Sequence, residues 1–476
     1  MKAKKILVTG AAGYIGGRLI PSLLEKGYAV NALIRHNEDV SARGWNDVQV
    51  YRGDVLDICT LYGALENVSV AYYLIHSMSE NGDFQIKDRI AASNFAEAAR
   101  QMGVERIIYL SGLGSDRNLS KHLKSRQESG KILGCTGIPV TEFRAAQVIG
   151  SGSISFELIR YLTERLPIIL SPQWINSKTQ PVAVNDVIYY LSSALTHPET
   201  TGKIIEIGGA DIVTYKELIS TYAELRGLKR PFISLPFLSP SFFAFWVNII
   251  TPIPRSIARP LLEGIKNDVI ITECGAGQYF SHNPLTLKEA IRTALEEQRL
   301  NKVTTFWSLP QSEASFNQMS DSVVSQREGL FIDEVSVLTS ISADELFKKI
   351  ICLGGGYGWP SYNLLWSLRG YTDQFFGGSG KLRGRRCMID LRPGDPIDFF
   401  TVEALEKNRL LRLKVDLKMP GEGWLEFLIE EQYKQRKLII RAYFNPKGTR
   451  GLLYWKALLP FHKLIFKSTL EKITKQ

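Results

Sequence analysis

The first two hundred residues alternate short apolar runs with amphipathic stretches of helical length, and the connections between them are short. Apolar runs of about four to eight residues that alternate with helices are typical of a parallel sheet covered by helices on both faces. The pattern therefore predicts an α/β fold with a doubly wound parallel sheet. The predicted strands are residues 5–9, 28–34, 48–53, 69–75, 106–110 and 140–144, and a clear helix between them covers residues 91–101.

The pattern becomes mixed beyond about residue 211. Helical periodicity over residues 215–226 and 287–298 predicts a substrate-side subdomain that roofs the carboxyl edge of the sheet. Residues 301–330 are rich in Ser and Gln and have no strong periodicity, which indicates a linker.

A second domain is expected over residues 331–476, following a first domain over residues 1–300. In residues 411–417 apolar and charged positions alternate, which indicates a strand that is buried on one face only. The order of elements predicts an α+β, helix-grip-like domain in which a long final helix, bent at Pro460, closes over antiparallel strands and an apolar cavity. Further strands are predicted over residues 424–430 and 438–444, and helices over residues 343–352, 361–376 and 452–472.

The composition is that of an ordinary globular protein with more than one domain. Hydrophobic residues make up 45% of the 476 positions and charged residues 22%, so neither a disordered nor a fibrous chain is expected. The five cysteines are scattered and form no CxxC pair, which argues against a metal site or a disulfide framework and favours a reducing cytoplasm. The first strand begins almost at the N-terminus, so we expect no cleavable signal peptide.

The net charge is +10, and a basic balance suits nucleic acid, anionic lipid or an anionic cofactor. Because no arginine-rich arm or other nucleic-acid signature is present, we expect no nucleic-acid partner. The final helix, residues 452–472, combines lysines with large apolar residues. Two interpretations of it remain open: the helix closes the core of its domain, or it also makes a peripheral contact with an anionic membrane surface.

The apolar segment 241–251 is too short to cross a membrane. As a helix it would span about 17 Å, against a hydrocarbon core of about 30 Å. We expect it to be buried in the substrate-side subdomain, and the alternative is a helix that lies in a membrane interface.

A glycine-rich turn follows directly behind the first predicted strand. Gly10 permits a sharp turn, Gly13 lets backbone N–H groups approach a phosphate, and Gly16 lets the next helix pack against the strand. The N-terminal end of that helix would face the pyrophosphate of a dinucleotide, which predicts a Rossmann-type site. The alternative is a tight turn with no ligand. The predicted cofactor-binding residues of the turn are Gly10, Ala12, Gly13, Tyr14, Ile15 and Gly16.

The end of the second strand predicts which dinucleotide is bound. Arg35 stands where an NAD-preferring fold usually carries an acidic residue, and a guanidinium there suits a 2′-phosphate. We therefore expect NADP(H) to be favoured over NAD(H), with Arg35 as a solvated strand-end charge the alternative. Asp54 and Val55 follow the third strand, where Asp54 is placed to accept from the adenine amino group or, alternatively, to cap the next helix.

These motifs resemble a known family. Residues 1–300 are similar to an atypical short-chain dehydrogenase/reductase of the NAD(P)H-binding, NmrA-like kind, and residues 331–476 resemble a DUF2867 domain, with a helix-grip shape like that of polyketide-cyclase and lipid-transfer proteins. The resemblance covers nearly the whole chain and implies cofactor binding more specifically than it implies a reaction. The segments that carry it in the first domain are residues 9–16, 53–55, 76–78, 82–84, 111–114, 122–126 and 144–150.

The resemblance also implies catalytic positions, with one departure. Reductases of this family pair a serine with Tyr-x-x-x-Lys, whose phenol protonates the substrate oxygen. Ser111 matches the serine, but His122 and Arg126 stand at the tyrosine and lysine positions. His76 ends a predicted strand near the expected nicotinamide and is a second candidate acid. If a histidine donates its proton as imidazolium, turnover should rise as pH falls toward a pKa that is ordinarily about 6.5.

Three functions are consistent with the sequence. The first is an NADP(H)-dependent oxidoreductase that acts on an apolar or carbonyl small molecule. The second is a non-catalytic protein that senses NADP(H) or serves as a scaffold, which the missing Tyr-x-x-x-Lys motif favours. The third is an NAD(P)-dependent epimerase or isomerase. The substrate and the oligomeric state are left open by the sequence.

Overall fold

The computed structural model divides the chain into two compact units. The first unit comprises residues 1–250 and 255–307, and the second comprises residues 251–254 and 308–476. The residues described are 5–35, 45, 47–76, 84–114, 120–235, 255–265, 268–272, 275–299, 305, 331–362, 366–367, 369–371, 373, 385–387, 390–432, 435–446 and 448–475.

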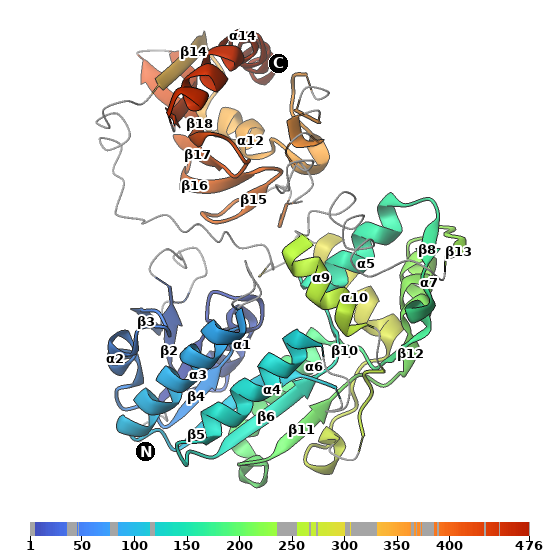
Figure 1. Ribbon diagram of the computed structural model, residues 1–476. Coiled ribbons are helices and arrows are strands. Elements are labelled where there is room, and N and C mark those ends of the chain that lie inside the picture. The colour runs from blue at the N-terminus through green and yellow to red at the C-terminus, as the bar shows by residue number, and fades with distance from the viewer. Residues whose placement is uncertain are drawn as a thin grey trace. The chain divides into compact units, whose positions relative to one another are not determined.

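The first unit is built on a seven-stranded parallel sheet with strand order β11-β6-β5-β4-β1-β2-β3 (Figure 1). The strand order reverses between β1 and β4, and such a switch point opens a crevice at the carboxyl ends of the strands. Strands β4 and β5 are buried along their whole length, as expected for a sheet that is covered on both faces. The strands are β1 (Lys5–Thr9), β2 (Ala29–Ile34), β3 (Val48–Arg52), β4 (Val70–Tyr73), β5 (Arg106–Gly112), β6 (Val140–Ala145) and β11 (Ile204–Ile207).

Helices cover both faces of this sheet, and each face has its own apolar core. On one face α1 and α6 contribute Leu19 and Val187 to the core, and on the other α3 and α4 contribute Phe95 and Leu133. The sheet is packed between these two layers of helices, which hold its carboxyl edge in place. The covering helices are α1 (Tyr14–Glu25), α2 (Tyr62–Leu65), α3 (Phe84–Gln101), α4 (Lys121–Gly134) and α6 (Val184–Ser193).

Smaller elements form the part of the first unit that was predicted to be a substrate-side subdomain. Thr214 begins α7 through a capping box, because its hydroxyl accepts from the Glu217 N–H while the Glu217 carboxylate accepts from the Thr214 N–H. Helix α9 contacts α4, so this part borders the helix that carries His122. Its elements are α5 (Ile154–Arg165), α7 (Tyr215–Leu225), α9 (Arg255–Gly264) and α10 (Leu287–Arg299), with the strand pairs β7 (Val148–Ile149) and β10 (Val182–Ala183), β8 (Ile169–Ser171) and β13 (Phe232–Ser234), and β9 (Lys178–Thr179) and β12 (Val213–Thr214).

The end of the first unit is attached to its beginning. The Thr305 hydroxyl donates to the Tyr14 carbonyl oxygen at 3.1 Å and accepts from Arg18 Nε at 3.0 Å. The Arg18 guanidinium also donates to the Ser151 carbonyl and pairs with the Glu297 carboxylate, both at 3.0 Å. This Arg18–Thr305 clasp fixes the first turn of α1 from the side.

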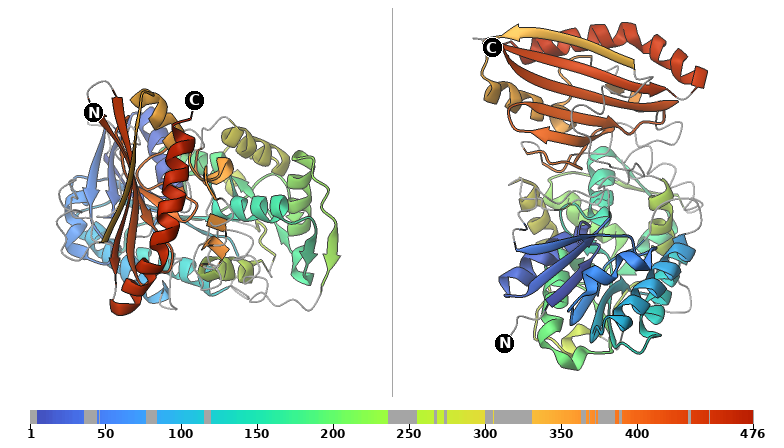
Figure 2. Two further views of the ribbon diagram at one scale, coloured as in Figure 1. Left: turned by 90° about the horizontal axis from the view of Figure 1, so that it is seen from above. Right: turned by 90° about the vertical axis from the view of Figure 1, so that its left-hand side faces the viewer.

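The second unit contains a six-stranded antiparallel sheet with order β14-β19-β18-β17-β16-β15. The long helix α14 (Gly448–Ile473) runs alongside this sheet (Figure 2) and contacts β14 and β19. Trp455 of α14 is stacked on Phe444 of β19, with ring centroids 5.4 Å apart. The other elements are α12 (Ala343–Ile351), β14 (Phe331–Thr339), β15 (Pro396–Ile397), β16 (Phe400–Glu406), β17 (Leu410–Val415), β18 (Gly421–Gln432) and β19 (Gln435–Pro446).

A buried ion pair lies within this sheet. Arg412 on β17 and Glu426 on β18 are directly paired in the strand register, and their side chains are 5% and 2% exposed, 2.6 Å apart. The Tyr443 hydroxyl donates to the other oxygen of Glu426 at 3.2 Å. Glu426 is also paired with Arg441 at 3.5 Å, so its buried charge is compensated by two guanidiniums and a hydroxyl rather than by water.

The predicted fold class is confirmed for both parts of the chain. The six strands predicted in the first domain correspond to β1 to β6, and α14 is a single helix that passes through Pro460. The seventh strand of the first sheet, β11, was not anticipated, and neither were β15 and β16. The segment 241–251 and, apart from Thr305, the predicted linker 301–330 lie outside the described residues, and so does much of 361–376, so the domain boundaries stay predictions. Within the described residues no helix is long and apolar enough to span a bilayer.

Candidate functional site

The glycine turn between β1 and α1 has the geometry of a phosphate cradle. Gly10 has φ = +62°, a conformation that glycine adopts without strain. The Gly13 N–H donates to the Gly10 carbonyl at 2.9 Å and closes the turn. A Cβ at position 16 would collide with the Gly10 carbonyl oxygen and lie 2.9 Å from Ala11 Cα, so only glycine permits this close approach of helix and strand.

The N-terminal end of α1 is suited to an anion. Gly13 is its N-cap, and among the described residues no side chain caps the first-turn N–H groups, which therefore remain available to an oxyanion. Ala12 is buried, and Ile15 packs against the core of the sheet. The Tyr14 hydroxyl is buried near Gly150, where a Cβ would lie 2.5 Å from it. Ala12, Tyr14 and Ile15 thus shape the turn through backbone and packing, and the turn fits a dinucleotide pyrophosphate.

The far end of the crevice carries positive charge from two neighbouring strands. Arg35 follows β2 directly and is exposed. In the parallel register of β2 and β3, Ile34 is paired with Arg52, so Arg52 ends its strand beside Arg35. Arg52 was not among the predicted cofactor-binding residues, because its place beside Arg35 is evident only from the register of the two strands.

Asp54 and Val55 lie just beyond β3. Asp54 Oδ1 accepts from the Leu56 N–H at 2.9 Å, which forms a local turn. Val55 is buried, and its carbonyl accepts from Asn94 Nδ2 at 3.1 Å. The structure therefore gives Asp54 a local turn contact, and it is Asp57 that caps the short helix that follows. A contact of Asp54 with adenine stays a prediction.

The four predicted catalytic residues meet at the carboxyl ends of β4 and β5. His76 follows β4, and Ser111 lies near the end of β5. His122 and Arg126 are one turn apart on α4, and the His122 ring centroid is 4.7 Å from that of His76. Arg126 Nη2 donates to the Leu110 carbonyl, which ties α4 to β5.

Several polar atoms of this cluster lack partners. Both ring nitrogens of His76, Ser111 Oγ and Arg126 Nε are buried and make no hydrogen bond of normal geometry among the described residues, although Ser111 influences the neighbouring Tyr109 hydroxyl. Buried polar groups are normally paired, and each unpaired one costs about 1–3 kcal/mol. Four such atoms at one edge of the sheet mark a place where a ligand would complete the hydrogen bonds, and this fits a nicotinamide and a substrate oxygen.

The two histidines are neutral at physiological pH. Burial, with a further contribution from the Arg126 charge, lowers the pKa of His122 to about 3. Burial, Arg126 and His122 together hold the pKa of His76 well below its usual value. An imidazolium is therefore disfavoured at both positions, contrary to the expectation that a protonated histidine acts as the acid.

Comparisons with known proteins agree with this geometry. Residues 10–146 match a family model described as NAD(P)H-binding, and residues 326–469 match the model DUF2867, described as a protein of unknown function. Sterol demethylase protein B of Methylococcus capsulatus is 34% identical over 113 residues, 23% of this chain and 34% of that protein. The decarboxylating sterol-4-alpha-carboxylate 3-dehydrogenase of Mus musculus is 31% identical over 113 residues, 23% of this chain and 30% of that protein.

The matched segment spans only about a third of each of these two relatives. Among solved structures, an NADPH-dependent quinone oxidoreductase from Escherichia coli, solved with NADPH, has a TM-score of 0.51 at 22% identity. The likeness covers 60% of this chain and 98% of that one and shows a shared fold. The glycine turn and the start of the parallel sheet fall within the NAD(P)H-binding match, and the second match covers most of the second unit. The chain therefore contains an N-terminal NAD(P)H-binding domain and a C-terminal DUF2867 domain.

Proposed function

We propose that the first unit is an oxidoreductase that binds NADP(H) in preference to NAD(H) and transfers hydride to an apolar substrate beside Ser111 and His122. The observation that carries the proposal is the cluster of unpartnered buried polar atoms at the carboxyl ends of β4 and β5. The cluster lies on the same edge of the sheet as the glycine turn, where a doubly wound fold binds its dinucleotide.

The preference for NADP(H) is supported by the two strand-end arginines. Arg35 and Arg52 follow neighbouring parallel strands, and two guanidiniums can share the oxygens of a 2′-phosphate. No acidic residue stands at position 35 to accept from a ribose 2′-hydroxyl, as an NAD-preferring site would require.

The catalytic cluster favours a particular kind of hydride acceptor. When bound, the reduced nicotinamide would supply a hydride. Ser111 and neutral His122 can donate hydrogen bonds to a substrate oxygen, and the Arg126 charge stabilises negative charge that develops there. Neither donor is a strong acid at neutral pH. His122 stands where the family has tyrosine, and because the pKa of its imidazolium is about 3, the ring at pH 7 is neutral and has no acidic proton to give.

A substrate whose reduced anion is stable by itself suits such a site. A quinone or an enone takes up the hydride as a resonance-stabilised anion, which then receives one proton from water. A simple ketone would form a strongly basic alkoxide that needs an acid in contact. The names of the sterol-modifying relatives and of the quinone oxidoreductase also point to apolar substrates.

The first experiment measures cofactor affinity by calorimetry for the wild-type chain and for Arg35→Ala and Arg52→Ala. Each variant should lose about tenfold to hundredfold in NADPH affinity, the equivalent of about 1.5–3 kcal/mol for a charged hydrogen bond, with NADH affinity unchanged. Arg100→Ala is the matched control, since Arg100 is exposed on α3 and pairs with Glu97. Equal wild-type affinities for NADPH and NADH would overturn the preference.

The second experiment measures NADPH oxidation with a panel of quinones, enones and ketones between pH 5.5 and 8.5. We expect the quinones and enones to react fastest, with a rate that varies little with pH. Ser111→Ala and His122→Asn should lower the rate by about tenfold to a thousandfold, whereas Lys124→Ala, an exposed position on the same helix, should not.

A non-catalytic role as an NADP(H) sensor is the second candidate. It is favoured by the neutral histidine at the tyrosine position. Tight NADPH binding with no oxidation by any member of the panel would replace the oxidoreductase proposal with this one.

A further inference from the structure

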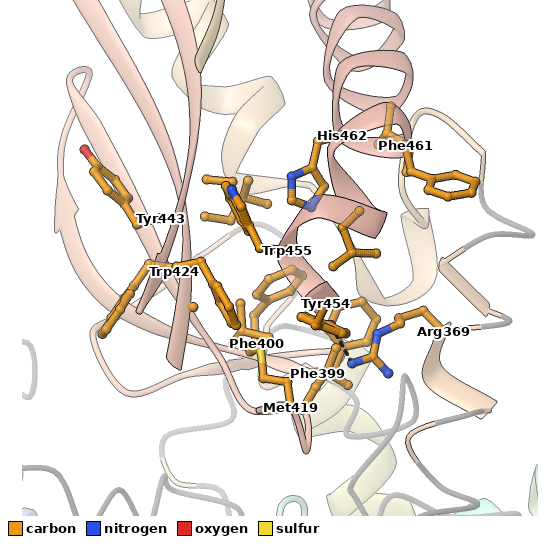
Figure 3. Close-up of a pocket in the computed structure, with 18 of the residues that line it drawn as sticks. Arg369, Phe399, Phe400, Met419, Trp424, Tyr443, Tyr454, Trp455, Phe461 and His462 are labelled. Carbon is orange, nitrogen blue, oxygen red and sulfur yellow. Dashed lines mark hydrogen bonds between the residues drawn. The ribbon is translucent and has the colours of Figure 1, made fainter. Parts of the chain in front are cut away.

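The second unit contains a partly open cavity of about 360 Å³ between the sheet and α14. Its wall comes from β16, β17, β18 and β19 and from α14, with Arg369 at one side (Figure 3). The helical residue Trp366 also lines it. All of the described lining residues belong to the second unit. The cavity is thus separate from the proposed hydride-transfer site and has its own chemistry.

The wall is apolar and mainly aromatic. Half of the twenty lining residues are Phe, Tyr or Trp, and most of the others are aliphatic. Small-molecule sites are typically concave recesses lined mainly by apolar and aromatic side chains, with a few polar groups. This recess has that character, and its wall is well packed, as shown by Trp455 stacked on Phe444.

The polar groups in the wall are mostly hydrogen-bond donors. Trp366 Nε1 is buried and has no hydrogen-bond partner among the described residues, and an indole N–H can only donate. Arg369 lies three positions further along and donates Nη2–H to the Tyr454 hydroxyl at 2.9 Å. Among the described lining residues there is no Asp or Glu. An acceptor with negative charge is therefore the complementary partner for this part of the wall.

His462 does not change this electrostatic picture. Its Nδ1 is 3.6 Å from Asp333 Oδ2, and its ring is stacked on Phe466. Burial lowers the pKa of His462, while Asp333 opposes this shift. The imidazole is therefore a mainly neutral part of the wall at pH 7, and Arg369 supplies the positive charge.

We propose that this cavity binds a single-chain or flat-ring amphiphile with one carboxylate, whose apolar body fills the aromatic wall and whose carboxylate accepts from Trp366 and Arg369. Small-molecule pockets range from about 300 to 1,000 Å³, so a cavity near the lower limit suits one chain or ring system rather than a two-chain phospholipid. The donor pair selects an anionic acceptor over a cationic or neutral head group.

The test uses the full chain and matched probes, with binding followed by tryptophan fluorescence and calorimetry. Dodecanoate, methyl dodecanoate and dodecylamine share one chain and differ in the head group. We expect dodecanoate to bind at least about tenfold more tightly than the ester, because a charge-assisted hydrogen bond is lost in the ester, and dodecylamine to bind least. 2-Naphthoate, compared with dodecanoate, distinguishes a flat-ring ligand from a chain.

Two kinds of variant locate the site. Arg369→Leu should lower dodecanoate affinity by about tenfold or more and leave the ester within about twofold, whereas Arg409→Leu, an exposed arginine of the same unit, should change neither. Gly423→Leu should block the acid and the ester together, since a Cβ at Gly423 meets only ordinary or flexible neighbours and its side chain would occupy the cavity. Leu458→Trp fills the same space from α14 and serves if Gly423→Leu fails to fold.

Equal affinity for the acid, the ester and the amine would overturn the carboxylate assignment. Dodecanoate binding that persists in both filled variants, with folding verified by circular dichroism, would overturn the cavity as the site. Both results are independent of NADPH binding, which Gly423→Leu should leave unchanged.

Discussion

The two candidate sites of this chain are built in opposite ways. In the first unit, backbone groups of a seven-residue turn provide the cradle, and the side chains that matter are polar and unpartnered. In the second unit, side chains from four strands and two helical segments form the wall, and nearly all of them are apolar. The first site depends on local geometry and the second on the assembly of residues distant in sequence. A substitution that abolishes ligand binding at one site should therefore leave binding at the other site unchanged.

The largest effect is expected from the buried ion pair of the second unit. Glu426→Leu removes the buried carboxylate that lies 2.6 Å from the Arg412 guanidinium, and the loss of one partner of a buried pair should cost about 3–5 kcal/mol. Calorimetry of the full chain should show a lower melting temperature for the second unit, while NADPH binding is retained. Glu406→Gln is the control, because its pair with Arg409 is exposed and such pairs contribute little. A simultaneous loss of cofactor binding would contradict the independence of the two sites.

The converse change is Gly16→Ala in the first unit. The added Cβ would collide with the Gly10 carbonyl and push α1 away from β1, so NADPH affinity should fall by at least about a hundredfold, or ~2.7 kcal/mol. Dodecanoate binding should be unchanged. Gly63→Ala is the matched control, since its nearest neighbour would lie 3.8 Å from the new Cβ. Wild-type NADPH affinity in Gly16→Ala would show that the turn is not the cradle.

A smaller effect is expected from pH. The folded-state pKa of His122 is about 3, and burial is its main cause, whereas the unfolded value is near 6.5. The unfolded chain therefore binds the extra proton between these values, so this residue's contribution to stability is intact above about pH 6.5 and decreases as pH falls toward 3. His122→Asn should flatten the dependence of the first unit's melting temperature on pH between 7 and 5. Burial also lowers the pKa of His462 in the second unit. His462→Asn should therefore flatten the pH dependence of the melting temperature of the second unit only.

The smallest effect concerns the exposed face of α14. Leu453, Phe461 and Leu464 are 69%, 48% and 50% exposed, and exposed lysines lie among them. We expect at most weak sedimentation with anionic liposomes, reduced when salt is raised from about 50 mM to about 500 mM. Leu453→Glu with Leu464→Glu should abolish it without altering dodecanoate binding. Liposome binding that persists both at high salt and in the double variant would contradict this weak, electrostatically assisted contact.

Local signals predicted much of the first unit. The strands are short apolar runs, and Gly10, Gly13 and Gly16 are required by the conformation of a few consecutive residues, so one segment carries the information. Arg35 could be placed because a strand end is a local feature. Arg52 was missed, although it ends the next strand, because only the parallel register shows that the two arginines are neighbours.

Long-range effects account for what the sequence did not predict. The low pKa of His122 arises mainly from burial, which several elements provide and which cannot be read from residues 122–126 alone. An apolar cavity was expected in the second domain, but its donor pair was not, since Trp366 and Arg369 become part of one wall only when the sheet and α14 assemble. Strand β15 has only two residues, and the pairing of β16 is irregular between Val402 and Ala404, so the alternation of apolar and polar residues in β16 is short.

The Arg18–Thr305 clasp has a consequence for the order in which the first unit is completed. It joins Tyr14 to a residue 291 positions later in the chain, and a contact of such high sequence separation forms late, because its loop-closure entropy must be overcome first. During synthesis the N-terminal part of a chain folds first, so α1 and the glycine turn emerge long before Thr305. The helix that would face the pyrophosphate is therefore among the first elements to be made and among the last to be secured.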